Sequence, residues 1–323
     1  MLDRTLISAP APHPDSAPAA TNFTPDAALY RLQSWRAMAA LAADWCLIGA
    51  AFASAILWPT PLVWLGAAVI IARTQLALAV IMHESAHGTL LPRQRWNDAI
   101  GQAFAAGPLC LSLKTYRAGH LQHHKAPMRH DDPVMLVFGI HDYPVSRARL
   151  ALRLLSAVTG VAYVMSAVKF ARGDYRAVMP AVAKSGAIKA WEVASMLGTN
   201  ALLLGVLALV GHPWLYLGLW TLPSLTLLPL FGRVRAIMEH AGLPESADQG
   251  HSARTIVRPS WQTFLCGPHG IHYHIAHHLH VRIPFYRLGA LHRQMEDQAV
   301  LPGGNLYQGY GGVLRDVSAA APR

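Results

Sequence analysis

Residues 272–280 of this chain read His-Tyr-His-Ile-Ala-His-His-Leu-His, and they contain the pattern H-x-x-H-H at His274, His277 and His278. On a helix, positions i, i+3 and i+4 share one face, so these three imidazoles are expected to point to one place. Neutral imidazole is a ligand for iron, zinc, copper and nickel. The stretch therefore predicts a metal site.

Two further clusters repeat this arrangement. A second H-x-x-H-H stands at His120, His123 and His124, and an H-x-x-x-H stands at His83 and His87. Eight clustered histidines exceed what one tetrahedral ion uses, which favours two metal ions with open positions. The chain has 18 histidines, so one pair would mean little. Three clusters in so apolar a chain indicate metal ligands.

The order and spacing of these clusters resemble the integral-membrane fatty acid desaturase and hydroxylase superfamily. The resemblance covers residues 76–292, including residues 131–133 (Asp-Asp-Pro) and residues 233–242 (Arg-x-Arg-x-x-x-Glu-His-Ala-Gly). In that superfamily a histidine in the second segment is an additional iron ligand, which adds His240. The metal ligands that the resemblance implies are His83, His87, His120, His123, His124, His240, His274, His277 and His278.

The composition is that of a membrane protein. Hydrophobic residues make up 53% of the chain, charged residues only 14%, and the mean hydropathy is +0.27. These values are too apolar for a soluble domain of this length. The net charge of +10 follows the pattern of a membrane surface and does not indicate a nucleic-acid partner. The three cysteines are widely spaced, which argues against a disulfide framework or an iron–sulfur site.

Four stretches are long enough to cross a bilayer, which takes about 20 residues. They predict an all-α, multi-pass protein with four transmembrane helices at residues 37–58, 62–82, 191–211 and 214–232. Spans two and four end just before His83 and His240, and both are expected to continue as helices. The histidines would then lie in a cap on the membrane.

Two more apolar stretches are interpreted as re-entrant or interfacial helices. Residues 99–113 are too short to span, and residues 150–170 contain Arg153 and have basic residues on both sides.

The outer domain boundaries are set by composition. Residues 1–28 are predicted to be a disordered Ala/Pro-rich tail, residues 29–297 a catalytic domain, and residues 298–323 a glycine-rich loop or tail.

The positive charges predict the orientation of the chain. Of the 27 Lys and Arg residues, only Arg73 lies within a proposed span, and neither outer turn carries one. Because basic loops stay in the cytosol, the N-terminus, the histidine clusters and the C-terminus are all expected on the cytosolic side. The expected location is a bacterial inner membrane.

Several residues near the clusters have other expected roles. Three carboxylates are predicted to accept an N–H from a ligating imidazole and to fix its tautomer: Glu84, Asp132 and Glu239. Asp131 is an equally good candidate for an ordinary solvated or helix-capping carboxylate. His272 and His280 flank the last cluster and are not expected to bind metal directly. Inside the spans, Asp44 and Arg73 lie at similar depth and are expected to pair.

The resemblance implies an O₂-dependent, non-haem diiron oxidoreductase that acts on unactivated C–H bonds of an aliphatic chain. It implies two Fe, O₂ as co-substrate, an apolar lipid-like substrate in the bilayer and an external electron carrier such as a ferredoxin, rubredoxin or cytochrome. A fatty acid or acyl-lipid desaturase is favoured over a lipid or carotenoid hydroxylase or ketolase. The metal ligands are the only catalytic residues predicted.

Two more distant alternatives remain. Residues 83–87 also fit the zinc metalloprotease pattern H-E-x-x-H, with Glu84 as general base, but a zinc protease leaves two clusters unexplained. A metal transporter would place its histidines inside the spans, near the middle of the membrane.

Overall fold

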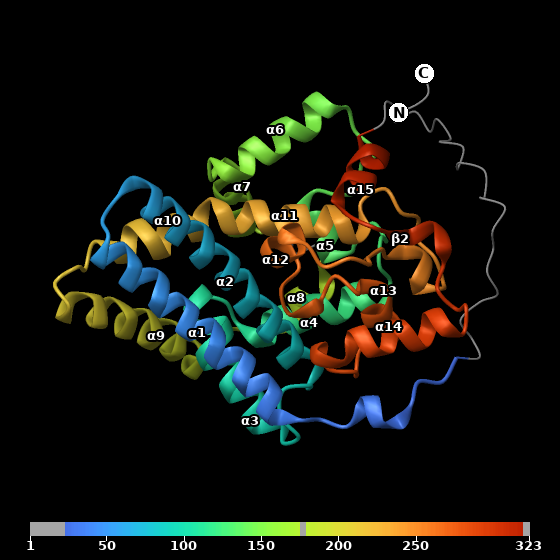
Figure 1. The fold of residues 1–323 in the computed structure, drawn as a ribbon, viewed down its shortest axis with the longest axis horizontal. Helices are drawn as coiled ribbons and strands as arrows, with labels where there is room; N and C mark the ends of the chain where they lie inside the picture. The colour runs from blue at the N-terminus through green and yellow to red at the C-terminus, as the bar shows by residue number, and fades with distance from the viewer. Residues whose placement is uncertain (1–22, 175–178, 319–323) are drawn as a thin grey trace.

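The structure is a computed structural model that describes residues 23–174 and 179–318 (Figure 1). The described residues are mostly helical. Strand among them is limited to β1 (Thr255–Ile256) and β2 (Leu306–Tyr307), which pair in parallel with Thr255 opposite Leu306. The predicted all-α class is confirmed.

Four helical stretches are long and apolar enough to cross a membrane, as predicted. The first two, α1 and α2, form a hairpin, and the last is divided into the π-helical η5 and the helices α10 and α11. Their bounds are Ser34–Leu57 (α1), Pro61–His87 (α2), Ala190–Leu209 (α9) and Tyr216–His240, which contains η5 (Tyr216–Thr221), α10 (Leu222–Leu225) and α11 (Leu227–His240).

Helix α2 begins and ends on recognisable signals. The Thr60 side chain accepts a hydrogen bond from the Val63 N–H, and Pro61 occupies the first turn, where a missing N–H costs nothing. The helix ends at His87 and is capped by Gly88, whose φ of 75° is the left-handed conformation that glycine adopts easily. The helix therefore runs past the predicted end of span two at residue 82 and carries His83 and His87 on its last turns.

The two doubtful stretches are not straight spans. Helix α6 (Arg147–Val158) and helix α7 (Val161–Arg172) meet at a bend of 80° beside Gly160, which has a φ of 78°. The earlier stretch, residues 99–113, is broken into the end of α3 (Gln94–Gly101), the π-helical η3 (Gln102–Ala106) and the 3-10 helix η4 (Gly107–Leu109).

Short helices connect and cover the long ones. Helix α4 (Leu113–Lys125) and helix α13 (His274–Leu279) carry two of the histidine clusters. The other elements are η2 (Ala27–Tyr30), α5 (Pro133–Phe138), α8 (Pro180–Lys184), η6 (Gln249–Ser252), α12 (Trp261–Cys266), η7 (Pro268–Gly270), η8 (Phe285–Arg287), α14 (Leu288–Asp297), η9 (Gly303–Asn305) and α15 (Tyr310–Val317).

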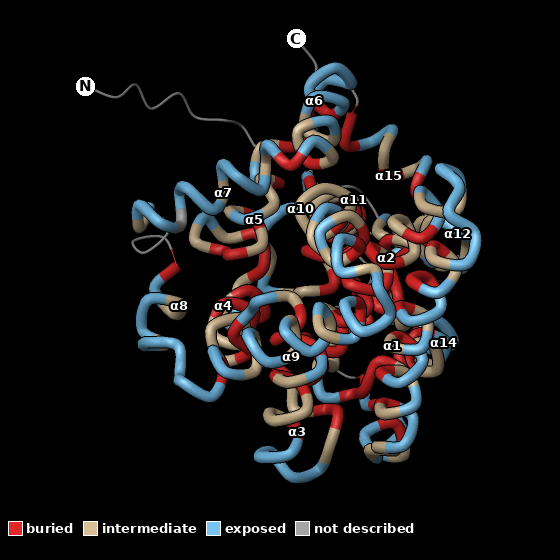
Figure 2. The backbone as a smooth tube through the Cα atoms, turned by 90° about the vertical axis from the view of Figure 1, so that its left-hand side faces the viewer, coloured by how far each residue is buried: buried red, intermediate tan, exposed pale blue. Residues whose placement is uncertain are grey.

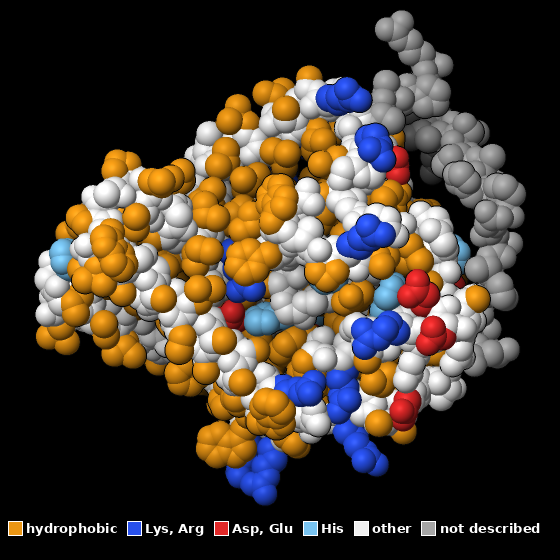
Figure 3. Space-filling view, viewed as in Figure 1, with side chains coloured by type: hydrophobic (Ala, Val, Ile, Leu, Met, Phe, Trp, Pro, Cys, Tyr) orange, Lys and Arg blue, Asp and Glu red, His pale blue; other side chains and the backbone are white. Residues whose placement is uncertain are grey.

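The surface divides the molecule into two ends. In Figure 3, hydrophobic side chains cover the region over α1, α2, α9 and α10, whereas the charged side chains lie mainly on the right-hand side, over α13, α14 and α15, and along the lower edge near α3. Leu62 and Leu209 are 80% and 89% exposed at the hydrophobic end. Exposed residues lie along the outer faces of α1 and α9, and buried residues concentrate around α2 and α11 (Figure 2). Such an apolar surface suits contact with lipid.

The terminal segments differ from expectation where they are described. The predicted N-terminal tail lies outside the described residues except for residues 23–28, in which Phe23 is buried against the ring of His280. The predicted C-terminal loop contains helix α15, and Tyr310, Val313 and Val317 are its buried face. Their i, i+3, i+7 spacing is that of an amphipathic helix. The neighbouring glycines are typical of a loop, so the helix was not predicted from the sequence.

Candidate metal centre

Four helices bring the predicted histidines together. His83 and His87 lie at the end of α2, and His240 is the last residue of α11. Helix α4 carries His120, His123 and His124, and helix α13 carries His274, His277 and His278. Because each cluster has i, i+3 or i, i+4 spacing on a helix, its imidazoles extend from one side of that helix.

The nine side chains form two groups. The five-histidine group consists of His83, His87, His120, His124 and His277. The four-histidine group consists of His123, His240, His274 and His278. Within each group, one ring nitrogen from every histidine lies within 4.8 Å of the others. The second and third clusters each supply both groups, so the two groups are immediate neighbours.

The converging atoms in both groups are the Nε2 nitrogens. In the five-histidine group, Nε2 of His83 lies 2.9 Å from Nε2 of His277, and Nε2 of His87 lies 2.8 Å from Nε2 of His120. In the four-histidine group, the Nε2 atoms of His240 and His274 are 2.8 Å apart. Two nitrogens bound at right angles to one ion, each about 2.0–2.1 Å away, would lie about 2.9 Å apart. The spacing therefore fits metal coordination.

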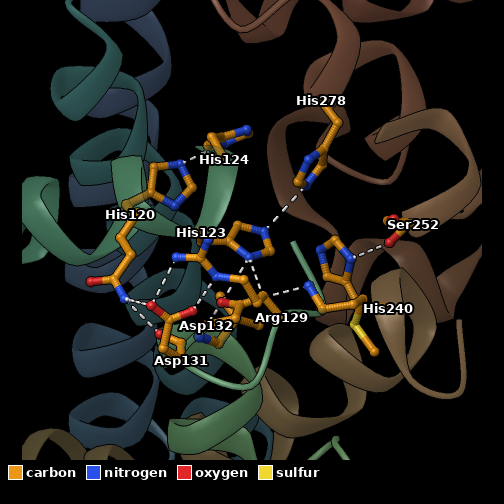
Figure 4. A network of polar contacts seen from close by, with 12 residues as sticks. His120, His123, His124, Arg129, Asp131, Asp132, His240, Ser252 and His278 are labelled. Atoms are coloured by element: carbon orange, nitrogen blue, oxygen red, sulfur yellow. Dashed lines mark hydrogen bonds and ion pairs between the residues drawn. The ribbon is translucent and has the colours of Figure 1, made fainter. Parts of the chain in front are cut away.

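Outer hydrogen bonds set the tautomers of four of these histidines. Two of them donate their Nδ1–H to a carboxylate: His83 to Glu84 Oε1 (3.2 Å) and His123 to Asp132 (2.9 and 3.0 Å). The other two donate to a carbonyl oxygen: His240 to that of Ser252 (2.8 Å) and His278 to Gln249 Oε1 (3.2 Å). Figure 4 shows two of these contacts, at Asp132 and Ser252. With the proton on Nδ1, the lone pair on Nε2 points inward. Facing lone pairs repel unless a cation lies between them, so the donor set fits metal ions.

Five of the six clustered histidines on α4 and α13 are held neutral. Burial is the main cause that lowers the pKa of each well below its ordinary value, and neighbouring histidines lower it further. This applies to His120, His124, His274, His277 and His278. A neutral imidazole is the form that binds a metal.

Two of the three predicted outer carboxylates contact a histidine directly. Glu84 accepts from His83 through Oε1, and its Oε2 accepts from the Thr89 hydroxyl (2.7 Å) and the Phe285 N–H (3.0 Å). Asp132 accepts from His123 and also from the backbone N–H groups of Met128 (2.9 Å) and Val134 (2.8 Å). Although burial acts to raise the pKa of Asp132, these hydrogen bonds hold it below its usual value.

The third carboxylate has a different main partner. Glu239 accepts a hydrogen bond of 2.7 Å from Arg235 and lies 3.5 Å from Nδ1 of His274, at the limit of a hydrogen bond. Asp131 pairs with Arg129 and accepts from Gln122, and it contacts no histidine of either group.

The flanking histidines lie outside both groups. Nδ1–H of His272 donates to the Ile256 carbonyl (2.7 Å), and Nδ1 of His280 lies 3.2 Å from the Tyr30 hydroxyl. Gln249 was not predicted from the sequence, yet its Oε1 accepts from His278 and its Nε2 donates to the His124 carbonyl (2.5 Å). It thus links a residue of each group, and no sequence motif marks it.

The predicted buried ion pair has a third member. Nη1 of Arg73 donates to Asp44 Oδ1 at 3.3 Å, as the sequence suggested. The other carboxylate oxygen, Oδ2, accepts from Nε2 of His269 at 2.7 Å. This partner cannot be recognised from the sequence, because 225 residues separate His269 from Asp44.

Comparison of the sequence with known proteins identifies related enzymes. The dihydrorhizobitoxine desaturase of Bradyrhizobium elkanii is 25% identical over 241 residues, which are 72% of this chain and 66% of that protein, just under two thirds of its length. The fatty acid desaturase family matches residues 59–310, a range that contains all nine histidines. Since this range is well over half of the chain, the protein belongs to the fatty acid desaturase family, a family of oxidoreductases.

Proposed function

We propose that this protein is a membrane-bound, O₂-dependent diiron enzyme that desaturates an aliphatic chain. The observation that supports it most is the convergence of nine Nε2 atoms into two neighbouring groups. Imidazole suits iron, and two groups with few other ligands leave positions for O₂. Iron bound there would supply the oxidising chemistry, while the protein supplies binding and orientation.

The chain contributes orientation and a dry, neutral environment. All nine proposed ligands, His83, His87, His120, His123, His124, His240, His274, His277 and His278, are imidazoles. Glu84 and Asp132 hold His83 and His123 in the tautomer that presents Nε2 to a metal. Burial around the groups limits the access of water to the proposed metal sites.

The contacts of Glu84 argue against the zinc protease alternative. A general base needs a free carboxylate oxygen that faces the reacting water. Here Oε1 accepts from His83, and Oε2 accepts from Thr89 and Phe285. Glu84 is therefore better assigned as the partner of a metal ligand.

The reaction is assigned to desaturation on the strength of the names. Both the family and the Bradyrhizobium elkanii relative are named as desaturases. Apolar helices that could cross a membrane suit a lipid-like substrate, such as a fatty acyl chain. Because the family is named for fatty acids, a fatty acid or acyl lipid is the first substrate to test. The relative is named for dihydrorhizobitoxine, so a smaller aliphatic molecule is the second. Hydroxylation by the same centre is the main alternative.

Electrons must come from another protein. Removal of two hydrogens with O₂ as oxidant yields two waters and consumes two further electrons and two protons. We propose that a ferredoxin, rubredoxin or cytochrome delivers these electrons on the cytosolic side, where the histidine groups and both termini would lie. The basic residues outside the spans support this orientation.

Product analysis with a suitable reductase and carrier tests the reaction. Mass spectrometry of lipids from cells with and without the protein should reveal a product that has lost two hydrogens. A product that has gained one oxygen would assign the protein to the hydroxylases. Iron analysis should give about two irons per chain, since neither group alone accounts for all nine histidines. A single zinc per chain, with proteolysis that disappears in Glu84→Gln, would overturn the proposal.

A further inference from the structure

One segment, called here the 269–285 loop, contains the short helix α13 and supplies ligands to both histidine groups. Residues 269–285 contain His274 and His278, which belong to the four-histidine group, and His277, which belongs to the five-histidine group. The two ends of this loop meet, because the rings of His269 and Phe285 have centroids 5.1 Å apart. A movement of this loop would therefore displace ligands of both proposed metal sites.

The beginning of the loop is attached to the α1–α2 hairpin. Nε2–H of His269 donates to Asp44 Oδ2 at 2.7 Å, and Asp44 is only 3% exposed. Arg73, the other partner of Asp44, donates through Nε to the Phe264 carbonyl at 3.1 Å and lies over the Phe264 ring. The buried pair thus holds the chain at two points, residues 264 and 269, shortly before the ligands begin.

The backbone at His269 supports a specific role for its side chain. His269 has φ 58° and ψ 23°, the left-handed conformation in which a Cβ is unfavourable and glycine is the usual residue. Gly270 follows it with φ 74°. A side chain that persists in such a conformation is held there by its surroundings. The contacts with Asp44 and Phe285 are the interactions that hold it.

The end of the loop is attached to a proposed metal ligand. The Phe285 N–H donates to Glu84 Oε2 at 3.0 Å, and Glu84 Oε1 accepts from Nδ1–H of His83 at 3.2 Å. One carboxylate therefore fixes both the loop end and His83. Contacts run without interruption from Asp44 through His269, Phe285 and Glu84 to His83.

We propose that His269 and Asp44 are positioning residues that close the loop 269–285 and hold its three histidines in register with α2 and α4. This inference rests on the proposed metal function. The pair touches no metal and acts through the loop. Loss of the pair should loosen both histidine groups together, since the loop supplies both.

The test compares variants at His269 and Asp44, and a control variant, with the wild-type protein. His269→Gly removes the imidazole and relieves the left-handed backbone, so a loss of function cannot come from strain. His269→Asn keeps an N–H donor in a residue that tolerates this conformation and should rescue part of the effect. His141→Gly changes an exposed turn histidine outside both groups and serves as the control.

The main measurement is the rate at which iron-loaded protein loses iron to a chromogenic Fe(II) chelator. Removal of a group that hydrogen-bonds a metal ligand typically costs 10–100-fold in affinity. His269 acts one contact further away, so we expect an effect at the lower end of this range, with both irons released about tenfold faster from His269→Gly. Asp44→Asn should have a similar effect, and the combination should be no faster than either change. Release at the wild-type rate in both His269→Gly and Asp44→Asn would overturn the inference.

A second measurement separates this inference from the proposed function. Hydrogen exchange of residues 269–285 in the metal-free protein should be faster in His269→Gly than in the wild type or His141→Gly. Unchanged exchange would contradict the loop-closing role even if the variant were inactive. A wild-type protein that binds no iron, yet shows faster loop exchange in His269→Gly, would overturn the proposed function and leave the loop-closing role intact.

Discussion

The five-histidine and four-histidine groups differ in how their ligands are anchored. In the four-histidine group, the Nδ1–H groups of His123, His240 and His278 each have a hydrogen-bond acceptor, whereas Nδ1 of His274 lies 3.5 Å from Glu239 and has no hydrogen-bond partner among the described residues. In the five-histidine group, only His83 has a carboxylate partner among the described residues. Outer hydrogen bonds orient ligands and raise their basicity. The four-histidine group thus compensates for its smaller number of ligands with firmer support.

The five-histidine group relies more on packing. The Nδ1 atoms of His124 and His277 are buried and have no hydrogen-bond partner among the described residues. The ring of His120 instead stacks on Tyr116, with centroids 5.3 Å apart and an angle of 11° between the planes. Such ligands can adjust more readily than hydrogen-bonded ones. The two proposed irons are therefore expected to differ in how strongly they are held.

The largest expected effect is the loss of a ligand from either group. His123→Ala and His277→Ala remove one ligand from the four-histidine and the five-histidine group, respectively, and both should abolish product formation. Iron analysis of each purified variant should show a reduced iron content, with His130→Ala, an exposed residue outside both groups, as control. Full activity in either variant would contradict the assignment of that group.

A smaller effect is expected from the outer partner of His123. Asp132→Asn replaces a carboxylate that is buried against His123 and should weaken iron binding 10–100-fold in the four-histidine group alone. Asp131→Asn is the matched control, because the adjacent Asp131 pairs with Arg129. Chelator competition on both variants provides the measurement. Equal weakening of iron binding in the two variants would contradict a specific role for Asp132 in holding His123.

A change in the buried Asp44–Arg73 pair should lower the stability of the folded protein and should affect both histidine groups to the same extent. Arg73→Ala leaves the Asp44 carboxylate with His269 as its remaining partner, so its cost should fall below the 3–5 kcal/mol typical of a broken buried pair, at about 2 kcal/mol. The double change to alanine at Arg73 and Asp44 should be less destabilising than the sum of the single changes. Additive free energies of unfolding in a double-mutant cycle would refute the contact.

The smallest effect is expected at Gln249. Gln249→Leu removes the hydrogen bond to His278 and the one to the His124 carbonyl. Since one hydrogen bond contributes about 1 kcal/mol, iron should bind severalfold more weakly in the four-histidine group. Gln249→Glu keeps the acceptor and should restore the affinity. If both variants bind iron like the wild type, the amide has no part in orienting His278.

Sequence patterns predicted the features that depend on local spacing. The histidine clusters share helix faces because of their i, i+3, i+4 spacing, and spans need only a run of apolar residues. The division of the nine histidines into five and four depends on how α4 and α13 face each other, so it required the structure. His269 and Gln249 were missed because each is a single polar residue whose partner lies far away in the chain. Helix α15 was missed because glycines mask its apolar face.

Helix α2 is an unbroken rod that carries Arg73 near its middle and His83 and His87 at its end. At a rise of 1.5 Å and a turn of 100° per residue, the ten residues from Arg73 to His83 fix both a height of about 15 Å and a rotational phase. One inserted residue between them would turn His83 by about 100° and direct it away from His277. The number of residues between Arg73 and His83 therefore determines where the His83 imidazole points. Deleting or inserting one residue in this part of the helix should disturb the proposed metal centre far more than most substitutions there.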